Sequence, residues 1–253
     1  MEVLAKQYCL SVAAGKRLIA KAVTELPQIK RALKGYTIVI VAGTTNAYVA
    51  EELLKQLHQE SEFDRQCFFR GITLPPHQKR PSGEKFLGDV VIIDGQWHKG
   101  LTLYDVVDQL KEGDIIVKGA NAVNLQDQEA AVLIEHTRAG TMGVGIQAVI
   151  GRRVELLIPV GLEKRITDRI SSIAAQVNAP GTTGLRYFPI KGTIITELEA
   201  IQLLSGCNAQ LIAAGGVSQA EGSSWLLVSG TQQQLSCIDQ IMAEVKHEPP
   251  FVL

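Results

Sequence analysis

Residues 36–54 combine a strand, a tight turn and a helix, and this unit restricts the fold more than any other part of the sequence. The run TIVIVAG at 37–43 is β-branched and uninterrupted, as in parallel strands that are buried on both faces. A helical pattern follows from about Asn46 to Gln59, with Glu51 and Lys55 at the four-residue spacing of a helix surface. A strand that turns directly into a helix predicts an α/β protein.

The same alternation continues along the chain. Predicted strands cover 89–96, 113–119 and 154–161, with a further short strand at 67–72. Predicted helices cover 3–33, 102–110, 129–134, 147–151 and 163–177. Gly140, Gly143 and Gly145 predict a glycine-rich turn between two of these segments. Strands alternating with helices predict a Rossmann-like three-layer core with a mainly parallel sheet.

The pattern changes after the loop NAPGTTG at 178–184. Strands at 192–196, 209–213 and 225–228 then share some 60 residues with helices at 197–204 and 231–245. This spacing predicts a small α+β unit, with a ferredoxin-like arrangement as one candidate. We therefore expect an α/β domain over residues 1–188 and a small α+β subdomain over 189–253.

Composition excludes several classes of protein. Apolar residues make up 46% of the 253 residues, and Lys plus Arg (25) balances Asp plus Glu (26). A globular chain without a basic excess is not expected to bind nucleic acid. No apolar run has the length of a membrane span, and four dispersed cysteines form no metal motif. We expect a cytoplasmic homo-oligomer that contacts no membrane and carries neither a metal ion nor a cofactor.

The turn Gly43-Thr44-Thr45-Asn46 is the first candidate site. It joins a strand end to a helix N-terminus, where free backbone N–H groups and the helix dipole attract phosphate or carboxylate. In open α/β sheets, ligands bind at this carboxyl edge of the strands. The alternative is plain N-capping, for which Thr, Asn and Gly are common.

Two segments carry a resemblance to a known superfamily. The stretch KRLIAKAV…GYTIVIVAGTTNAYVAEEL and the strand end DIIVKGANAVN at 114–124 resemble the NagB/RpiA/CoA-transferase-like superfamily. That superfamily includes ribose-5-phosphate isomerase type A and glucosamine-6-phosphate deaminase. The resemblance covers about the first 160 residues and implies that Gly43, Thr44, Thr45 and Asn46 hold a substrate phosphate. In the isomerases the second segment reads like Asp-Gly-Ala-Asp-Glu-Val-Asp, whereas no acid remains in Lys118–Asn124.

The second segment supplies further candidate residues. Lys118 follows a strand and either pairs with a phosphate or acts through a lowered pKa; the alternative is a surface lysine. We expect Gly119, Asn121 and Asn124 to bind the ligand, although Asn is also a common turn former. Glu129 is the candidate proton carrier, or else an acid that stabilises a helix start. Gly140 and Thr141 are expected to contact a phosphate unless their segment is an ordinary turn.

These residues leave three functions open. The first is an enzyme similar to a sugar-phosphate isomerase that acts on a small phosphorylated or carboxylated metabolite, with Lys118 and Glu129 as catalytic groups. The second is a binding or regulatory protein that has lost the catalytic acids. The third is a CoA-type transferase, which requires a glutamate in the cleft. The basic loop with His77, Lys79, Arg80 and Lys85 is a candidate lid over an anionic ligand.

Overall fold

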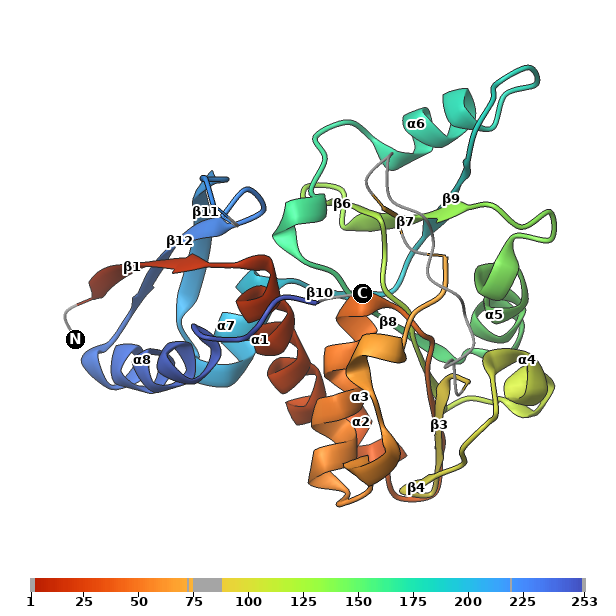
Figure 1. Ribbon diagram of the computed structural model, residues 1–253, viewed down its shortest axis with the longest axis horizontal. Coiled ribbons are helices and arrows are strands. Elements are labelled where there is room, and N and C mark those ends of the chain that lie inside the picture. The colour runs from red at the N-terminus through yellow and green to blue at the C-terminus, as the bar shows by residue number, and fades with distance from the viewer. Residues whose placement is uncertain (1–2, 72, 75–87, 219, 252–253) are drawn as a thin grey trace.

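The computed structural model describes residues 3–71, 73–74, 88–218 and 220–251. The candidate lid residues His77, Lys79, Arg80 and Lys85 lie outside these ranges. The described part is a mixed α/β fold with eight α-helices and a six-stranded, mostly parallel sheet (Figure 1). No helix within the described ranges has the length and apolar composition that a membrane span requires.

The central sheet has the order β10-β8-β5-β2-β3-β4. Its strands are β2 (Thr37–Ile40), β3 (Val90–Ile93), β4 (Gln96–Trp97), β5 (Ile115–Val117), β8 (Glu155–Pro159) and β10 (Thr193–Ile195). β10, β8, β5 and β2 run parallel, whereas β3 is antiparallel to β2 and β4 antiparallel to β3. The predicted mainly parallel sheet is therefore confirmed, with an antiparallel edge.

Apolar residues on both faces explain why β2 lies inside the sheet. Ile38 and Ile40 pack into one hydrophobic core, and Val39 and Val41 into a second core on the opposite face. The first core contains residues of α1 (Val12–Glu25), α2 (Pro27–Ala32), α3 (Thr44–Gln56), α7 (Glu197–Ser205) and α8 (Gln232–Val245). The second contains residues of α4 (Leu103–Val106) and α5 (Gly140–Arg152). Because side chains alternate along a strand, helices on both faces require this continuous apolar run.

Two smaller antiparallel sheets flank the central one. β1 (Leu4–Leu10), β12 (Ser224–Gly230) and β11 (Asn208–Ala214) form the sheet at the left of Figure 1, where the red N-terminal strand lies beside the blue C-terminal strands. β6 (Ala122–Asn124), β7 (Glu129–Ile134) and β9 (Arg186–Ile190) form the other, against which α6 (Ile170–Val177) packs. Short 3-10 helices are η1 (Glu60–Glu62), η2 (Arg65–Cys67), η4 (Val107–Gln109) and η5 (Leu162–Lys164). The division of the chain at residue 188 stays a prediction, although β1 and β10 both pair across it.

Several predicted elements are wrong. Residues 4–10 form a strand rather than the start of a helix, and residues 129–134 form β7 rather than a helix. The glycines at 140, 143 and 145 lie in helix α5 rather than in a turn. Residues 65–67 form η2, so the part of the predicted strand 67–72 that is described is not a strand. In each strand case, pairing with distant segments overrides the local propensity of the sequence.

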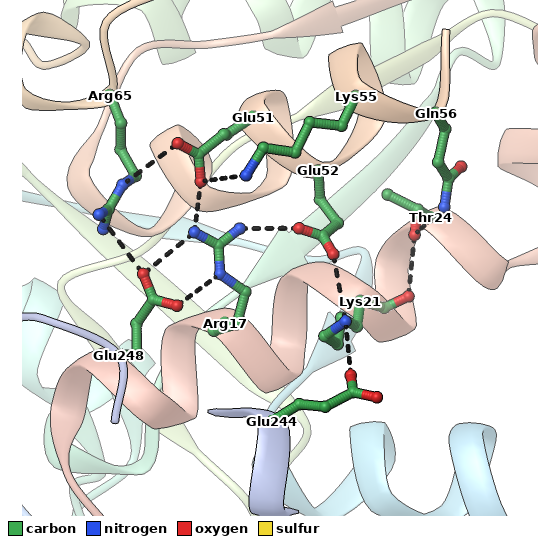
Figure 2. Close-up of polar contacts among 10 residues, drawn as sticks. All are labelled: Arg17, Lys21, Thr24, Glu51, Glu52, Lys55, Gln56, Arg65, Glu244 and Glu248. Carbon is green, nitrogen blue, oxygen red and sulfur yellow. Dashed lines mark hydrogen bonds and ion pairs between the residues drawn. The ribbon is translucent and has the colours of Figure 1, made fainter. Parts of the chain in front are cut away.

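A buried ion-pair network joins α1, α3 and the segment after α8 (Figure 2). The guanidinium of Arg17 pairs with Glu51, with Glu52 at 2.8 Å and with Glu248 at 2.9 Å. Only 8% of the Arg17 side chain is exposed. Arg65 pairs with the same Glu248 at 3.4 Å, so the C-terminal segment is held against both α1 and η2.

The guanidinium groups of both arginines of this network lie over the aromatic ring of Tyr48. The guanidinium carbon is 5.0 Å from the ring centroid for Arg17 and 4.1 Å for Arg65. The Tyr48 hydroxyl donates to the carbonyl oxygen of Pro249 at 3.3 Å. The ring is fully buried, so the cations face it in a desolvated setting that favours cation–π contact.

Gly15 allows close contact between α1 and α7. A Cβ at this position would lie 2.3 Å from Oε1 of Glu197, a side chain that is 2% exposed and accepts a hydrogen bond from Leu162 N–H at 2.9 Å. Because that carboxyl is buried and hydrogen-bonded, moving it aside is costly, and we expect Gly15→Ala to lower the free energy of unfolding by about 1–3 kcal/mol.

Gly151 provides the control for this measurement. It lies in helix α5, and a Cβ there would meet nothing within 4 Å. Gly151→Ala should therefore raise the free energy of unfolding, by up to about 1 kcal/mol, through helix propensity. Urea unfolding of both variants tests the contact, and an equal gain in stability from both would disprove it.

Candidate functional site

A cavity of about 1000 Å³ opens where β2 and β5 end and where α3 and α5 begin. Its polar lining includes the turn before α3, the residues after β5, and side chains from three other segments. The residues on which the following argument depends are Gly43, Thr44, Thr45, Asn46, Arg70, Lys118, Gly119, Asn121, Gly140, Thr141 and Lys164. The cavity therefore lies at the carboxyl edge of the parallel strands, the usual ligand position in open α/β sheets.

Helix α3 begins at Thr44 without a side-chain cap. Gly43 is its N-cap residue, and no side chain accepts a hydrogen bond from the first turn. The backbone N–H groups of that turn have no partner within the helix, as at every helix start. Plain capping by Thr or Asn side chains is therefore not what this segment does.

Two buried polar side chains follow in the same turn. Thr45 and Asn46 are only 2% and 1% exposed, and the Thr45 hydroxyl and the Asn46 Oδ1 have no hydrogen-bond partner among the described residues. The Nδ2 of Asn46 donates to Val41 O at 2.7 Å and Val117 O at 3.0 Å. Asn46 thus connects the end of β2 to the end of β5. Because its Nδ2 donates both of these bonds, its Oδ1 is the amide atom that is left without a partner.

Lys16 reaches the turn from helix α1. Its Nζ donates to the Thr44 hydroxyl at 3.2 Å. The side chain is almost wholly buried, and this burial, with the nearby Lys164 cation adding to it, lowers the pKa of Lys16 to about 8. A cation is therefore already in place beside the free N–H groups of α3.

Lys118 lies on the other side of Asn46, directly after β5. Its backbone N–H donates to Leu157 O at 2.9 Å, which extends the ladder between β5 and β8. Burial is the main reason that the pKa of Lys118 is lowered to about 8. The positive charges of Lys164 and Arg70 also lower this pKa, whereas the negative charge of Asp89 raises it.

Asp89 organises the strand end behind this cation. Its oxygens accept from Ala42 N–H at 2.9 Å and from Leu103 N–H at 2.8 Å, and it pairs with Arg70 at 3.1 Å. Burial raises the pKa of Asp89. The carboxylate is thus committed to the protein scaffold, and it holds Arg70 at the cavity.

Glu197 is a second buried acid near the site, at the start of α7. It accepts from Leu162 N–H in the segment that carries Glu163 and Lys164. Burial, with a smaller contribution from the neighbouring Glu163 carboxylate, raises the pKa of Glu197 to about 8. At neutral pH this carboxyl is therefore largely protonated.

The structure brings most of the predicted site residues together. Nine of them line the one cavity: Gly43, Thr44, Thr45, Asn46, Lys118, Gly119, Asn121, Gly140 and Thr141. Gly140 and Thr141 do so as the first residues of α5. Asn121 also has a structural bond, because its Oδ1 accepts from Leu133 N–H at 3.0 Å. The ligand roles assigned to these residues stay predictions.

Two predicted residues lie elsewhere. Asn124 donates to Thr167 O and Asp168 O and accepts from two backbone N–H groups, so its amide holds a turn. Glu129 is the first residue of β7, not of a helix, and it pairs with Lys191 at 3.0 Å. Neither side chain lines the cavity.

Lys16, Arg70, Asp89 and Glu197 were not found from the sequence. In the sequence, Lys16 looks like one of several lysines on an amphipathic helix. Arg70 lies in a segment that is neither helix nor strand, so no periodic pattern indicates its position. Asp89 could have been found from the sequence, because an acid directly before a buried strand is itself buried and requires hydrogen-bond partners. Within the described ranges, no group of three or more His, Cys, Asp or Glu side chains could hold a metal ion.

Comparison of the chain with protein-family models, with curated proteins and with solved structures finds no match.

Proposed function

We propose that the cavity binds a small phosphorylated metabolite, with its phosphate at the start of α3. The observation that carries this proposal is the uncapped first turn of α3, with Lys16 held on Thr44 and a buried, unpartnered Thr45 hydroxyl beside it. Backbone N–H groups, a hydroxyl and an ammonium together match the oxygens of a phosphate.

The charges across the cavity support an anionic ligand. Lys16, Lys118, Lys164 and Arg70 lie in or beside it. Of the nearby acids, Asp89 is engaged by Arg70 and two backbone N–H groups, and the raised pKa of Glu197 keeps it largely neutral. Glu135 is the acid in the described lining of the cavity. A site with more cations than carboxylates attracts anions and strengthens each contact with them.

The geometry favours a protein that binds its ligand without using acids at the predicted positions in the way that an isomerase does. Asn121 and Asn124 stand where the resembling isomerases carry acids, and both amides are engaged by backbone groups. Glu129 pairs with Lys191 and does not line the cavity. We also propose that the helices on the two faces of the central sheet make a Rossmann-like core of the superfamily that the sequence resembles.

Lys16→Met tests the phosphate position. We expect the dissociation constant for ribose 5-phosphate, measured by calorimetry at pH 7, to rise by roughly tenfold or more, because a charge-assisted hydrogen bond is worth about 1.5–3 kcal/mol. Ribose without the phosphate should bind far more weakly to the unmodified protein.

Lys21→Met is the matched control, since Lys21 lies on the same helix and pairs instead with Glu52 at 3.5 Å and Glu244 at 3.1 Å. Its affinity for ribose 5-phosphate should match that of the unmodified protein. Equal losses in the two variants, or no stabilisation of the unmodified protein by phosphate or any sugar phosphate, would overturn the proposal.

A further inference from the structure

Lys118 differs from Lys16 and Arg70 in that its side chain pairs with no group among the described residues. Lys164 has no such partner either, but of these two lysines Lys118 is the one that directly follows a strand of the central sheet. Lys16 donates to Thr44, and Arg70 pairs with Asp89. Among the described residues, the Nζ of Lys118 takes part in no hydrogen bond and no ion pair. An amine that is partly withdrawn from water, lines a cavity and has no partner is costly to keep charged, and such a group is a candidate for a functional role.

The groups that face Lys118 come from three segments. Lys164 lies in η5, Arg70 follows η2, and Asp89 precedes β3. Two of these three are cations, and the single acid is already held by Arg70 and by two backbone N–H groups. Lysines become nucleophilic in such settings, beside other cations and away from bulk water.

The phosphate position and Lys118 lie close together through Asn46. That side chain, in the first turn of α3, donates to the carbonyl of Val117, the residue before Lys118. The Lys118 and Thr45 residues both line the same cavity. A small molecule with its phosphate at the helix start can therefore place a neighbouring carbon at the amine.

We propose that Lys118 is a nucleophilic amine that condenses with the carbonyl group of a phosphorylated aldehyde or ketone. The inference rests on the proposed phosphate site. The nitrogen lone pair of the neutral amine forms a bond to the carbonyl carbon, and the carbonyl π electrons move to oxygen. The nitrogen gives up its two protons, the oxygen takes up two and leaves as water, and the nitrogen lone pair then forms the C=N bond. The products are an imine and water, so no oxidant or other reactant is needed.

The position of the amine explains why acids are absent from this strand end. An imine withdraws electrons from the adjacent carbon, so a site that forms one needs less help from a carboxylic acid beside the carbonyl. Lys164 and Arg70 would then face the remaining oxygens of the ligand. This assigns the cavity to carbonyl chemistry on a phosphorylated carbon chain.

Reductive trapping tests the inference. The protein is incubated with glyceraldehyde 3-phosphate and cyanoborohydride, which reduces the imine to a stable secondary amine, and the modified peptide is identified by mass spectrometry. We expect one predominant adduct at Lys118. Its formation should rise with pH toward a midpoint near 8, where the pKa of Lys118 lies, and inorganic phosphate should slow it.

Two variants and one substrate act as controls. Lys118→Arg keeps the positive charge but cannot form an imine, and it should reduce trapping at least about tenfold. Lys111→Arg, at an exposed position outside the cavity lining, should trap at the unmodified rate. Glyceraldehyde without phosphate should react more slowly.

The outcomes separate this inference from the phosphate site. Undiminished trapping in Lys118→Arg, or adducts spread over exposed lysines, would overturn the role of Lys118. If inorganic phosphate still raises the melting temperature in that case, phosphate binding stands alone. If phosphate neither stabilises the protein nor slows trapping, the phosphate site itself is wrong.

Discussion

Replacing Arg17 by methionine should lower the free energy of unfolding by about 3–5 kcal/mol. Methionine keeps much of the packing of the arginine stem but leaves Glu51, Glu52 and Glu248 without their shared cation. These carboxylates are largely buried, and the cations left to them, Arg65, Lys21 and Lys55, lie farther away, at 3.4–3.7 Å. Buried charges that lose their nearest cation cost far more than the intact pair gains. Urea unfolding at pH 7 measures the difference.

Arg31→Met is the control of the same residue type. Arg31 pairs with Glu155 at the surface, where half of its side chain is exposed, so the loss should not exceed about 1 kcal/mol. A similarly small loss for Arg17→Met would mean that the network of Figure 2 contributes little to stability.

The structure also predicts an unusual dependence of stability on pH, caused by Glu197. Its pKa is about 8 in the folded chain and about 4.5 as an ordinary glutamate. Between these values the folded chain holds a proton that the unfolded chain has released, so the free energy of unfolding contributed by this group falls as pH rises. Once the pH passes 8, the full penalty, about 3–5 kcal/mol, is present.

Glu197→Gln should remove that penalty. The amide oxygen can still accept the bond from Leu162 N–H, so the two proteins should have similar stability at pH 5. At pH 8.5 the variant should be more stable by about 3–5 kcal/mol. The lowered pKa of Lys16 and of Lys118 acts in a different window, because both remain charged in the folded and unfolded chain below about pH 8.

Glu112→Gln is the control, since three quarters of the Glu112 side chain is exposed. The difference in stability between this variant and the unmodified protein should not change with pH over the same range. If Glu197→Gln behaves in the same way, Glu197 is ionised in the folded chain and the assignment of a neutral buried acid is wrong.

The central sheet could be predicted from sequence because its strands carry their own signal. The run at 37–43 is apolar at every position, and such a run is stable only where both faces are covered. The candidate site followed from the same signal, since strand ends in a parallel sheet meet at one edge. Lys118 and the turn at Thr44 were found in this way.

Elements that depend on distant partners could not be predicted. Residues 129–134 are Glu, Ala, Val, Leu and Ile, a composition that local propensity assigns to a helix. Pairing with β6 on one side and β9 on the other makes them a strand. Lys16 was missed for a similar reason, because its place at the site depends on how α1 packs against α3.

The glycines of α5 have a different structural role from the one predicted. Gly143 lies inside the helix, and a Cβ there would clash with the backbone carbonyl oxygen of Arg138. The missing side chain lets the segment before α5 lie close to the first turn of the helix, at a cost in helix propensity. A pattern of glycines thus indicates close packing here rather than a turn.

The pairing of β1 with β12 has a consequence for how the chain folds. Leu4 lies opposite Gly230, so all the elements from α1 to β11 are synthesised between β1 and its partner β12. Closing so long a loop is entropically costly, and β1 cannot pair with β12 until those elements have been made. Until then the hydrogen-bonding groups of residues 4–10 have no β12 beside them. During that interval β1 is open to pairing with strands of other chains.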